Sequence, residues 1–497
     1  MLPRILFRDV LLPTAATFTP FKSWRYLEEM CQREFEPLER QRNLRMSLVR
    51  ELLVHAYREV DIYRQALDRA GVDPIEVSYP TKFALVPITT KDDLREGFPN
   101  RQLARSFRGR ALRYSNTSGS TGRPLLLIQD TRDIAMKYAS ILRSRQVGGV
   151  DPLATQVRVT PNECQPALPA GDSPSVVNPL HRNHETPGRR SAFFVFLEKQ
   201  IVNPLIHARH MLEPFWRGPG GSGPVDFDGY LDQIDKLEPE VLSLYPIYAL
   251  LLAKHLRRTG RKPPKITGVI DFSGGLAPPW LAARVSEAFG VRTVQSAGGC
   301  EFARYAASCP SDPSRMHLAE SYAYVEAIRT DGSLCAPGEL GNLIVTSLHS
   351  WAMPIIRLEP GDVGRIFDEP CACGRKSRRL EHGGRVQALL RNAEGRWVTA
   401  LESWQALLSV SGLDLFQLHQ RSEKDYELHV VRAPSERLDT GELDERLALL
   451  LGKDATVKIT VVDSIPTEAS GKLQLVKSRT YEEFRPVSVR SKRVPVN

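Results

Sequence analysis

Apolar residues recur every three or four positions in the first part of the chain, and polar residues fill the gaps between them. The series runs through Leu44, Leu48, Leu52, Ala56, Val60, Tyr63 and Leu67. This spacing predicts an amphipathic helix, because residues three and four apart share one helical face. The pattern predicts a helical N-terminal section that ends at about Arg105.

Farther along, short β-rich runs alternate with helical ones. Residues 268–272 and 291–294 predict strands, and residues 279–289 between them predict a helix. Such alternation favours a parallel α/β core, in which ligands bind at the carboxyl ends of the strands. Two small motifs follow these strands directly, namely Ser273-Gly274-Gly275 and Gly298 with Glu301.

The pattern restarts near Arg385. Before it, residues 342–346 predict a strand that precedes a turn-rich segment at 360–362. After it, a strand, a helix and a strand are expected at 426–431, 443–451 and 457–462. We therefore predict an α/β fold with a large multi-layer N-terminal domain, residues 1–385, and a small mobile α+β domain, residues 386–497. The glycine-rich stretch at 218–224 is expected to be a surface loop.

Composition limits the class of protein. The 497 residues exceed the size at which one core usually divides. Hydrophobic residues make up 42% and charged residues 25%, as in ordinary globular proteins. No apolar run is long enough to span a membrane, and Arg8 and Asp9 interrupt the first apolar stretch too early for a secretory signal. These features predict a cytoplasmic protein.

A loop rich in hydroxyls and glycines reads Thr117-Ser118-Gly119-Ser120-Thr121-Gly122. Glycines let backbone N–H groups approach a phosphate, and hydroxyls add donors around its charged oxygens. The loop differs from the common P-loop, because no Gly-Lys-Ser/Thr follows four residues after a first glycine. An ordinary surface turn has the same composition, so the meaning of the loop depends on its partners.

Those partners follow in a fixed order: Ser273-Gly274-Gly275, Gly298 with Glu301, Arg357, Gly361-Asp362, Gly384-Arg385 and Ala469-Ser470-Gly471-Lys472. The ordered set resembles the adenylate-forming superfamily and, within it, the phenylacetate–CoA ligase branch, which includes capsule-type relatives. The resemblance covers most of the chain. It implies ATP and a small carboxylic acid as substrates, Mg²⁺ as cofactor and CoA as the default acceptor.

The resemblance also implies a role for each motif. The loop from Thr117 to Gly122 would surround the triphosphate, and Glu301 would hold Mg²⁺. Lys472 would place a compact charge between the acid and the α-phosphate. Asp362 would accept hydrogen bonds from the ribose hydroxyls. The other nucleotide-binding residues would be Ser273, Gly274, Gly275, Gly298 and Arg385. The alternative for each charged residue is an ordinary place on the surface.

Two positions depart from the family's pattern. Ser296-Ala297 stand before Gly298, where relatives usually carry an aromatic residue that stacks on adenine. Gln387-Ala388 replace the acid expected at the hinge after Arg385. The resemblance therefore implies an active but divergent enzyme, with altered base stacking and altered domain rotation.

The seven cysteines suggest a second site. In a cytosolic chain they argue against a disulfide framework and direct attention to their spacing. Cys309, His317, Cys371 and Cys373 would make a closed tetrahedral zinc site, which would be structural because no position is left for water. Some relatives share the Cys-x-Cys-Gly turn and the upstream pair. The alternative is a set of unrelated reduced cysteines.

The function expected is an ATP-dependent acid–CoA ligase that acts on an aromatic acid. Transfer of the acyl group to an amine or a carrier protein, release of the adenylate as product, and a non-catalytic nucleotide-binding relative are the alternatives. The region at 154–217 is expected to select the acid, and the family admits a homodimer.

The net charge of +9 adds little to this interpretation. The basic runs at 375–379 and 490–493 lack the interleaved aromatic residues of nucleic-acid sites, so no nucleic acid is expected as a partner. We interpret these runs as solvated surface, or else as a field that attracts phosphates.

Overall fold

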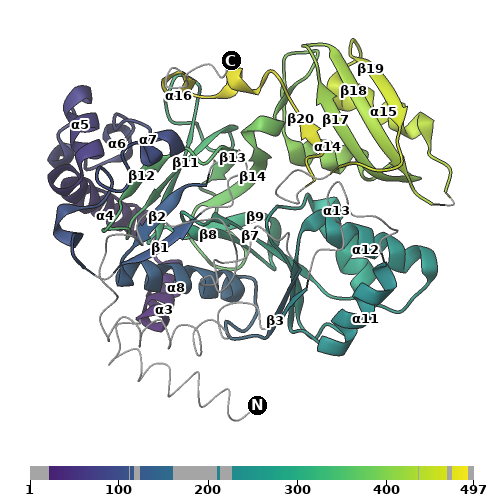
Figure 1. The fold of residues 1–497 in the computed structure, drawn as a ribbon, viewed down its shortest axis with the longest axis horizontal. Helices are drawn as coiled ribbons and strands as arrows, with labels where there is room; N and C mark the ends of the chain where they lie inside the picture. The colour runs from purple at the N-terminus through teal and green to yellow at the C-terminus, as the bar shows by residue number, and fades with distance from the viewer. Residues whose placement is uncertain are drawn as a thin grey trace.

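The structure, a computed structural model, describes residues 22–110, 112–116, 124–159, 210–212, 226–434, 436–466 and 473–490 (Figure 1). The loop from Thr117 to Gly122 and the segment from Ala469 to Lys472 both lie wholly outside the described residues. The same holds for the stretch at 218–224 and for most of the region at 154–217. The remaining predicted site residues can be placed.

The N-terminal section is helical, as predicted. Its elements are α3 (Ser23–Arg33), α4 (Leu38–Glu59), α5 (Asp61–Ala70), η2 (Pro74–Glu76), α6 (Pro80–Phe83), α7 (Lys91–Arg95) and η3 (Arg105–Phe107). The expectation of one helix through Leu44 to Leu67 is wrong, because extended backbone at Val60, with φ −126° and ψ 118°, separates α4 from α5. Val60 is fully buried. The apolar spacing therefore continues across the break and does not reveal it.

A twelve-stranded sheet crosses the large domain (Figure 1). One half is parallel, in the order β4-β3-β5-β6-β7. Its strands are β3 (Gln156–Val159), β4 (His210–Leu212), β5 (Val241–Leu244), β6 (Val269–Phe272) and β7 (Thr293–Gly299). The strand expected at 291–294 begins two residues later and continues to Gly299. A parallel core is thus confirmed for this half.

The other half of the sheet is antiparallel and continues from β7 in the order β8-β9-β14-β13-β11-β10, with β12 paired to β11. These strands are β8 (Ala303–Cys309), β9 (Asp312–Leu318), β10 (Ala323–Ile328), β11 (Gly341–Ser347), β12 (Ile355–Leu358), β13 (Asp362–Phe367) and β14 (Arg379–Arg385). Separate from this sheet, β1 (Arg113–Asn116) and β2 (Leu126–Gln129) form a hairpin on either side of the predicted phosphate loop.

Among the described residues, four helices follow β2 in the same domain: α8 (Thr131–Val147), α11 (Phe227–Leu237), α12 (Pro246–Thr259) and α13 (Pro279–Phe289). The last begins and ends at the predicted residues. Helix α8 packs between α3 and β8, and α12 packs against α13.

After η6 (Val386–Ala388) the chain enters a small α+β unit, as predicted. A four-stranded sheet in the order β19-β18-β17-β20 is its centre. Its elements are β15 (Leu390–Arg391), β16 (Trp397–Val398), α14 (Ala400–Leu407), β17 (Leu413–Gln420), β18 (Asp425–Arg432), α15 (Thr440–Leu451), β19 (Thr456–Val461) and β20 (Val476–Lys477). The chain then leaves this sheet through η7 (Tyr481–Phe484) and α16 (Val487–Arg490).

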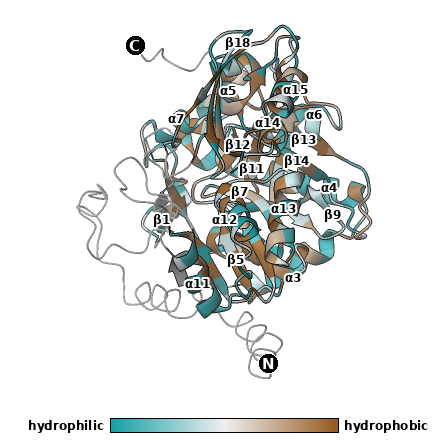
Figure 2. Cartoon of the chain, turned by 90° about the vertical axis from the view of Figure 1, so that its right-hand side faces the viewer, coloured by the Kyte–Doolittle hydropathy of each residue, from teal (hydrophilic) through white to brown (hydrophobic). Residues whose placement is uncertain are grey.

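Apolar side chains gather in two large buried clusters. One joins the N-terminal helices to the antiparallel half of the sheet. The other contains Leu250 and Leu256 of α12 together with Leu407, Leu413 and Leu415 of the small domain. In Figure 2 the inner strands are mainly brown, whereas the outer helix α11 is mainly teal. The two domains therefore share an apolar core in this arrangement.

Candidate functional site

Asp362 and Arg385 lie directly opposite each other on the neighbouring strands β13 and β14. Arg385 Nη1 donates a hydrogen bond of 3.0 Å to Asp362 Oδ1, and His382 Nε2 lies 3.8 Å from Oδ2. Burial raises the pKa of Asp362, but Arg385, His382 and Lys91 outweigh it and hold the pKa well below its usual range. Asp362 is therefore ionised, which suits an acceptor for the two hydroxyls of a ribose.

Glu301 lies in the turn between β7 and β8, and its carboxylate is almost fully buried. Lys91 Nζ, at the first residue of α7, lies 2.9 Å from Glu301 Oε1. Burial lowers the pKa of Arg385, but Asp362, Glu359 and Glu301 raise it above its usual value. The structure thus brings two predicted carboxylates and two cations into one electrostatic group.

The turn after β6 forms a further part of the site. Gly274 has a φ of +74°, and a Cβ at Gly275 would come within 2.6 Å of the ring of Tyr245, so both positions favour glycine. Ser273 is buried, and its Oγ has no hydrogen-bond partner among the described residues. A buried hydroxyl in this state is available to a ligand.

Tyr245 also contacts the first described residue after Lys472, the lysine that is predicted to be catalytic. Its hydroxyl lies 3.4 Å from the backbone oxygen of Leu473, the residue that follows Lys472. Leu473 is itself buried. The backbone next to Lys472 is therefore held beside the turn that contains Gly275.

Gly298 is required by close packing of the backbone. A Cβ at this position would lie 1.6 Å from the carbonyl oxygen of Ala303 across the β7–β8 pair. Ala297, where relatives carry an aromatic residue, is buried in the first apolar cluster. The effect of Ala297 on adenine stacking stays a prediction.

Sequence reasoning missed Lys91. Thr90 and Asp93 form a capping box at the start of α7, in which the backbone N–H of Asp93 donates to Thr90 Oγ1 at 3.2 Å and that of Thr90 to Asp93 Oδ2 at 2.7 Å. The box fixes the first helical residue, which is Lys91. A Thr-x-x-Asp pattern with lysine inside it was the available signal, but nothing in the sequence connects it to Glu301.

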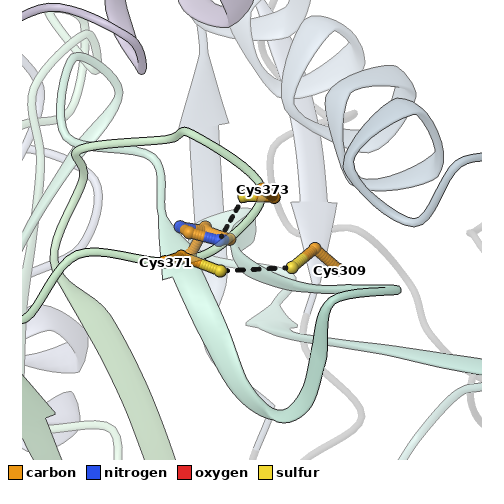
Figure 3. Close-up of side chains that lie close together, drawn as sticks. Cys309, Cys371 and Cys373 are labelled. Atoms are coloured by element: carbon orange, nitrogen blue, oxygen red, sulfur yellow. Dashed lines mark hydrogen bonds between the residues drawn. The ribbon is translucent and has the colours of Figure 1, made fainter.

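A second cluster contains Cys309 of β8, His317 of β9, and Cys371 and Cys373 from the loop before β14, and Figure 3 shows its three cysteines. One ligand atom from each residue lies within 4.8 Å of all the others. Cys309 Sγ and Cys371 Sγ are 3.8 Å apart, and Cys373 Sγ is 3.3 Å from His317 Nε2. Two thiolates about 2.3 Å from one tetrahedral zinc ion lie about 3.8 Å apart, so the spacing fits zinc.

The surroundings of His317 suit it to bind a metal ion through Nε2. Its Nδ1 lies 3.1 Å from Ser377 Oγ, which leaves Nε2 directed at the cysteines. Burial, together with Arg143 and Arg375, lowers the pKa of His317 to about 3. The imidazole is therefore neutral at neutral pH, as metal binding requires.

The arginines of the basic run at 375–379 are not solvated surface, contrary to our interpretation, whereas Lys376 is exposed. Arg375 Nε donates to Glu34 Oε2 at 2.7 Å, and Arg378 Nε donates to Glu320 Oε1 at 2.7 Å. Both carboxylates are buried. These arginines are structural and connect the loop with the cysteines to the rest of the large domain.

No family model matches the chain. The phenylacetate-coenzyme A ligase of Thermus thermophilus is 27% identical over 359 residues, which cover 71% of this chain and 72% of that protein. That of Pseudomonas putida is 23% identical over 442 residues, 87% of this chain and 91% of that protein. The crystal structure of 2-hydroxyisobutyryl-CoA ligase in the postadenylation state has a TM-score of 0.67 at 18% identity and covers 91% of this chain and 93% of that one.

By fold the chain is similar to the adenylate-forming ligases, and by sequence to the phenylacetate–CoA ligases. The resemblance found from the motifs is thereby confirmed. The same 2-hydroxyisobutyryl-CoA ligase in its thioesterification state gives a TM-score of 0.54. The fold of this chain is therefore more similar to that ligase in its postadenylation state than in its thioesterification state. No helix among the described residues combines the length and the apolar character needed to cross a bilayer.

Proposed function

We propose that this chain is an AMP-forming acid–thiol ligase. It activates a carboxylic acid with ATP and passes the acyl group to CoA. The observation that carries the proposal is the meeting of Asp362, Arg385, Glu301 and Lys91 at one edge of the sheet. An aromatic acid is the substrate class that the phenylacetate-coenzyme A ligase relatives support.

In the first half-reaction, a carboxylate oxygen attacks the α-phosphorus of ATP, and the bond to the β-phosphate oxygen breaks to release pyrophosphate. The main barrier is repulsion between two anions, so fixed positive charge contributes most. Lys91 is one such charge, and Lys472 is the second that we propose. Glu301 is a hard oxygen donor of the kind that Mg²⁺ prefers, and the ion would neutralise the phosphates there.

In the second half-reaction, the thiol sulfur of CoA loses its proton and attacks the carbonyl carbon of the adenylate. The bond from that carbon to the phosphate oxygen breaks, and AMP leaves with the electron pair. Asp362 is ionised in the large domain. It would hold the ribose through both steps, whereas the small domain presents Lys472 only in the first.

Pyrophosphate exchange with a panel of aromatic and aliphatic acids tests the first half-reaction, and the dependence of AMP release on CoA tests the second. The proposal expects exchange with an aromatic acid and AMP release only when CoA is added. If AMP is released with an amine or a carrier protein but not with CoA, that compound is the acceptor. ATP binding without exchange for any acid would indicate a non-catalytic relative.

We further propose that Cys309, His317, Cys371 and Cys373 bind one structural zinc ion. The spacing of the sulfur atoms and the neutral His317 support this proposal. All four positions are filled by protein, so the ion would not react with substrate. One equivalent of zinc in the purified chain is the expected measurement.

A homodimer stays a prediction, which sedimentation velocity can test.

A further inference from the structure

The last described segment of the chain, residues 481–490, packs on the large domain from Arg485 onward. Before that point, Glu483 and Phe484 still contact Arg391 and Trp397 of the small domain. Figure 1 shows α16 near β11 and β13, apart from the four-stranded sheet of the small domain. We call this segment the tail. The chain leaves the small sheet at β20, where Ser478 N lies 3.4 Å from the backbone oxygen of Gln387. Entry to the small domain and exit from it therefore meet at one point.

Apolar contacts hold the tail at two places. Phe484 is buried in a cluster with Val363, Val386 and Leu389. Val489 is fully buried in a second cluster that contains Ile88, three residues before Lys91. Burial of two such side chains stabilises the attachment. Phe484 thus contacts both domains, whereas Val489 packs on the large domain.

Polar contacts between these two places lead into the nucleotide site. Arg485 Nη2 donates to both carboxylate oxygens of Glu359, at 2.9 and 3.3 Å, and both side chains are buried. The backbone N–H of Glu359 donates to the oxygen of Thr89 at 3.0 Å. Glu359 lies three residues before Asp362, and Thr89 lies two residues before Lys91. The pair of Arg485 and Glu359 is therefore next to both segments of the nucleotide site.

Arg485 also reaches the turn between these residues. Its Nη2 lies 3.9 Å from the position that a Cβ would take on Gly361, and Arg385 Nη2 lies 3.1 Å from the same position. Gly361 has a φ of +88° and receives a hydrogen bond of 2.9 Å from the backbone of Val386. Two arginines therefore frame the turn that presents Asp362, and one of them comes from the tail.

From this geometry we infer that the tail is part of the nucleotide site and that Arg485 is a positioning residue for it. Arg485 holds Glu359, and through Glu359 it fixes Asp362 and the segment that leads to Lys91. This inference deepens the proposed function and rests on it. Because Arg485 binds Glu359 of the large domain directly, we expect it to act on ATP and on the acyl adenylate alike, unlike Lys472.

The test compares Arg485→Met and Arg485→Lys with Arg479→Met, a matched control at an exposed arginine of the same exit segment. Isothermal titration with AMP measures binding directly, and pyrophosphate exchange gives the KM values for ATP and for the acid. Arg485→Met is expected to weaken AMP binding and raise the KM for ATP about tenfold, since a charge-assisted pair is lost. The KM for the acid should change less than about twofold.

Arg485→Lys keeps the charge and should restore much of the AMP affinity, which covers the case in which Arg485→Met does not fold. A folded Arg485→Met chain with unchanged AMP affinity would overturn the inference, as would equal rises in both KM values. These outcomes leave the proposed function standing. A wild-type chain that binds no AMP and exchanges no pyrophosphate would overturn both.

Discussion

Lys91 Nζ lies 2.9 Å from Glu301 Oε1, and this ion pair joins the end of the helical N-terminal section to the turn after β7. The two partners differ in exposure, since the side chain of Lys91 is 29% exposed and that of Glu301 only 7%. The lysine can therefore turn toward a ligand while the carboxylate stays in place. Such a pair is suited to a polyanion with a divalent ion, because the carboxylate can bind the ion and the lysine a phosphate oxygen.

Replacement of this lysine should affect the chemistry more than the fold. Lys91→Met is expected to slow pyrophosphate exchange about 100-fold, because a charge directed at the transition state is lost. Lys82→Met is the matched control, since Lys82 is exposed on the preceding helix and lies 3.7 Å from Glu76. Exchange rates and melting temperatures of both variants are measured together. Equal rates in the two variants would remove Lys91 from the mechanism.

Lys472 should show a different profile, because we propose that the small domain to which it belongs rotates between the two half-reactions. Lys472→Ala is expected to suppress adenylate formation far more than acyl transfer from a supplied adenylate. Each step is measured separately by rapid quench. Lys453→Ala, at an exposed position of the small domain, is the control. Equal losses in both steps would contradict the assignment.

Local patterns predicted much of this fold. The helix at 279–289 and two strands of the small domain, at 426–431 and 457–462, followed from the local pattern of apolar residues, whereas β17 and β20 were not predicted. The motifs also led to Asp362 and Arg385, which the structure places opposite each other. Periodicity failed at Val60, where a buried residue sits in extended backbone without disturbing the apolar series.

Contacts between distant segments could not be predicted in this way. Nothing local relates Lys91 to Glu301, or Arg485 to Glu359, because these pairs exist only once the sheet has formed. The arginines at 375–379 were misinterpreted for the same reason. A dense basic run looks solvated until its buried acidic partners are known.

The cysteine cluster should determine stability through its metal. Cys371→Ser is expected to lower zinc content well below one equivalent and to reduce the melting temperature by on the order of 5–10 °C, since binding energy in a structural site is also folding energy. Cys335→Ser, outside the cluster, is the control and should keep its zinc. Activity at low temperature should fall only in proportion to unfolding. A zinc-free wild-type chain of full stability would reduce the cluster to ordinary cysteines.

Acid should destabilise the large domain through Glu320. Burial alone raises the pKa of Glu320, but Arg378 and Arg45 together lower it from 4.5 to about 2. A carboxyl group with a depressed pKa stabilises the fold at pH values above its pKa in the unfolded chain. This contribution is lost as the pH falls from about 4.5 toward 2. The contribution is on the order of 3 kcal/mol.

Urea unfolding between pH 6 and pH 3 measures this loss. Glu320→Gln is expected to be less stable than the wild type at pH 6, because two arginines lose their partner, and to lose less stability on acidification. Glu39→Gln, at an exposed position of α4, should keep the wild-type profile. Parallel profiles for wild type and Glu320→Gln would exclude this carboxylate as the source.

Asp414 connects the two domains in the observed arrangement. It lies in β17 of the small domain and accepts two hydrogen bonds of 3.0 Å from Arg258 Nη1 in α12 of the large domain. Lys254 Nζ of the same helix lies 3.2 Å from its backbone oxygen. Burial lowers the pKa of Lys254 to about 8, although Asp414 raises it. Rotation of the small domain would separate these groups.

Asp414→Asn should therefore favour the other domain arrangement. The variant leaves two half-buried cations without a counter-charge, which destabilises the arrangement that resembles the postadenylation state. Coupling energies of this kind change populations roughly 5- to 150-fold, and we expect adenylate formation to slow about tenfold. Acyl transfer from a supplied adenylate should stay constant or become faster, because we propose that this step uses the rotated arrangement. Asp454→Asn, whose side chain is 79% exposed, controls for the loss of charge on the same domain. If both half-reactions slow equally, Asp414 stabilises the fold without selecting a domain arrangement.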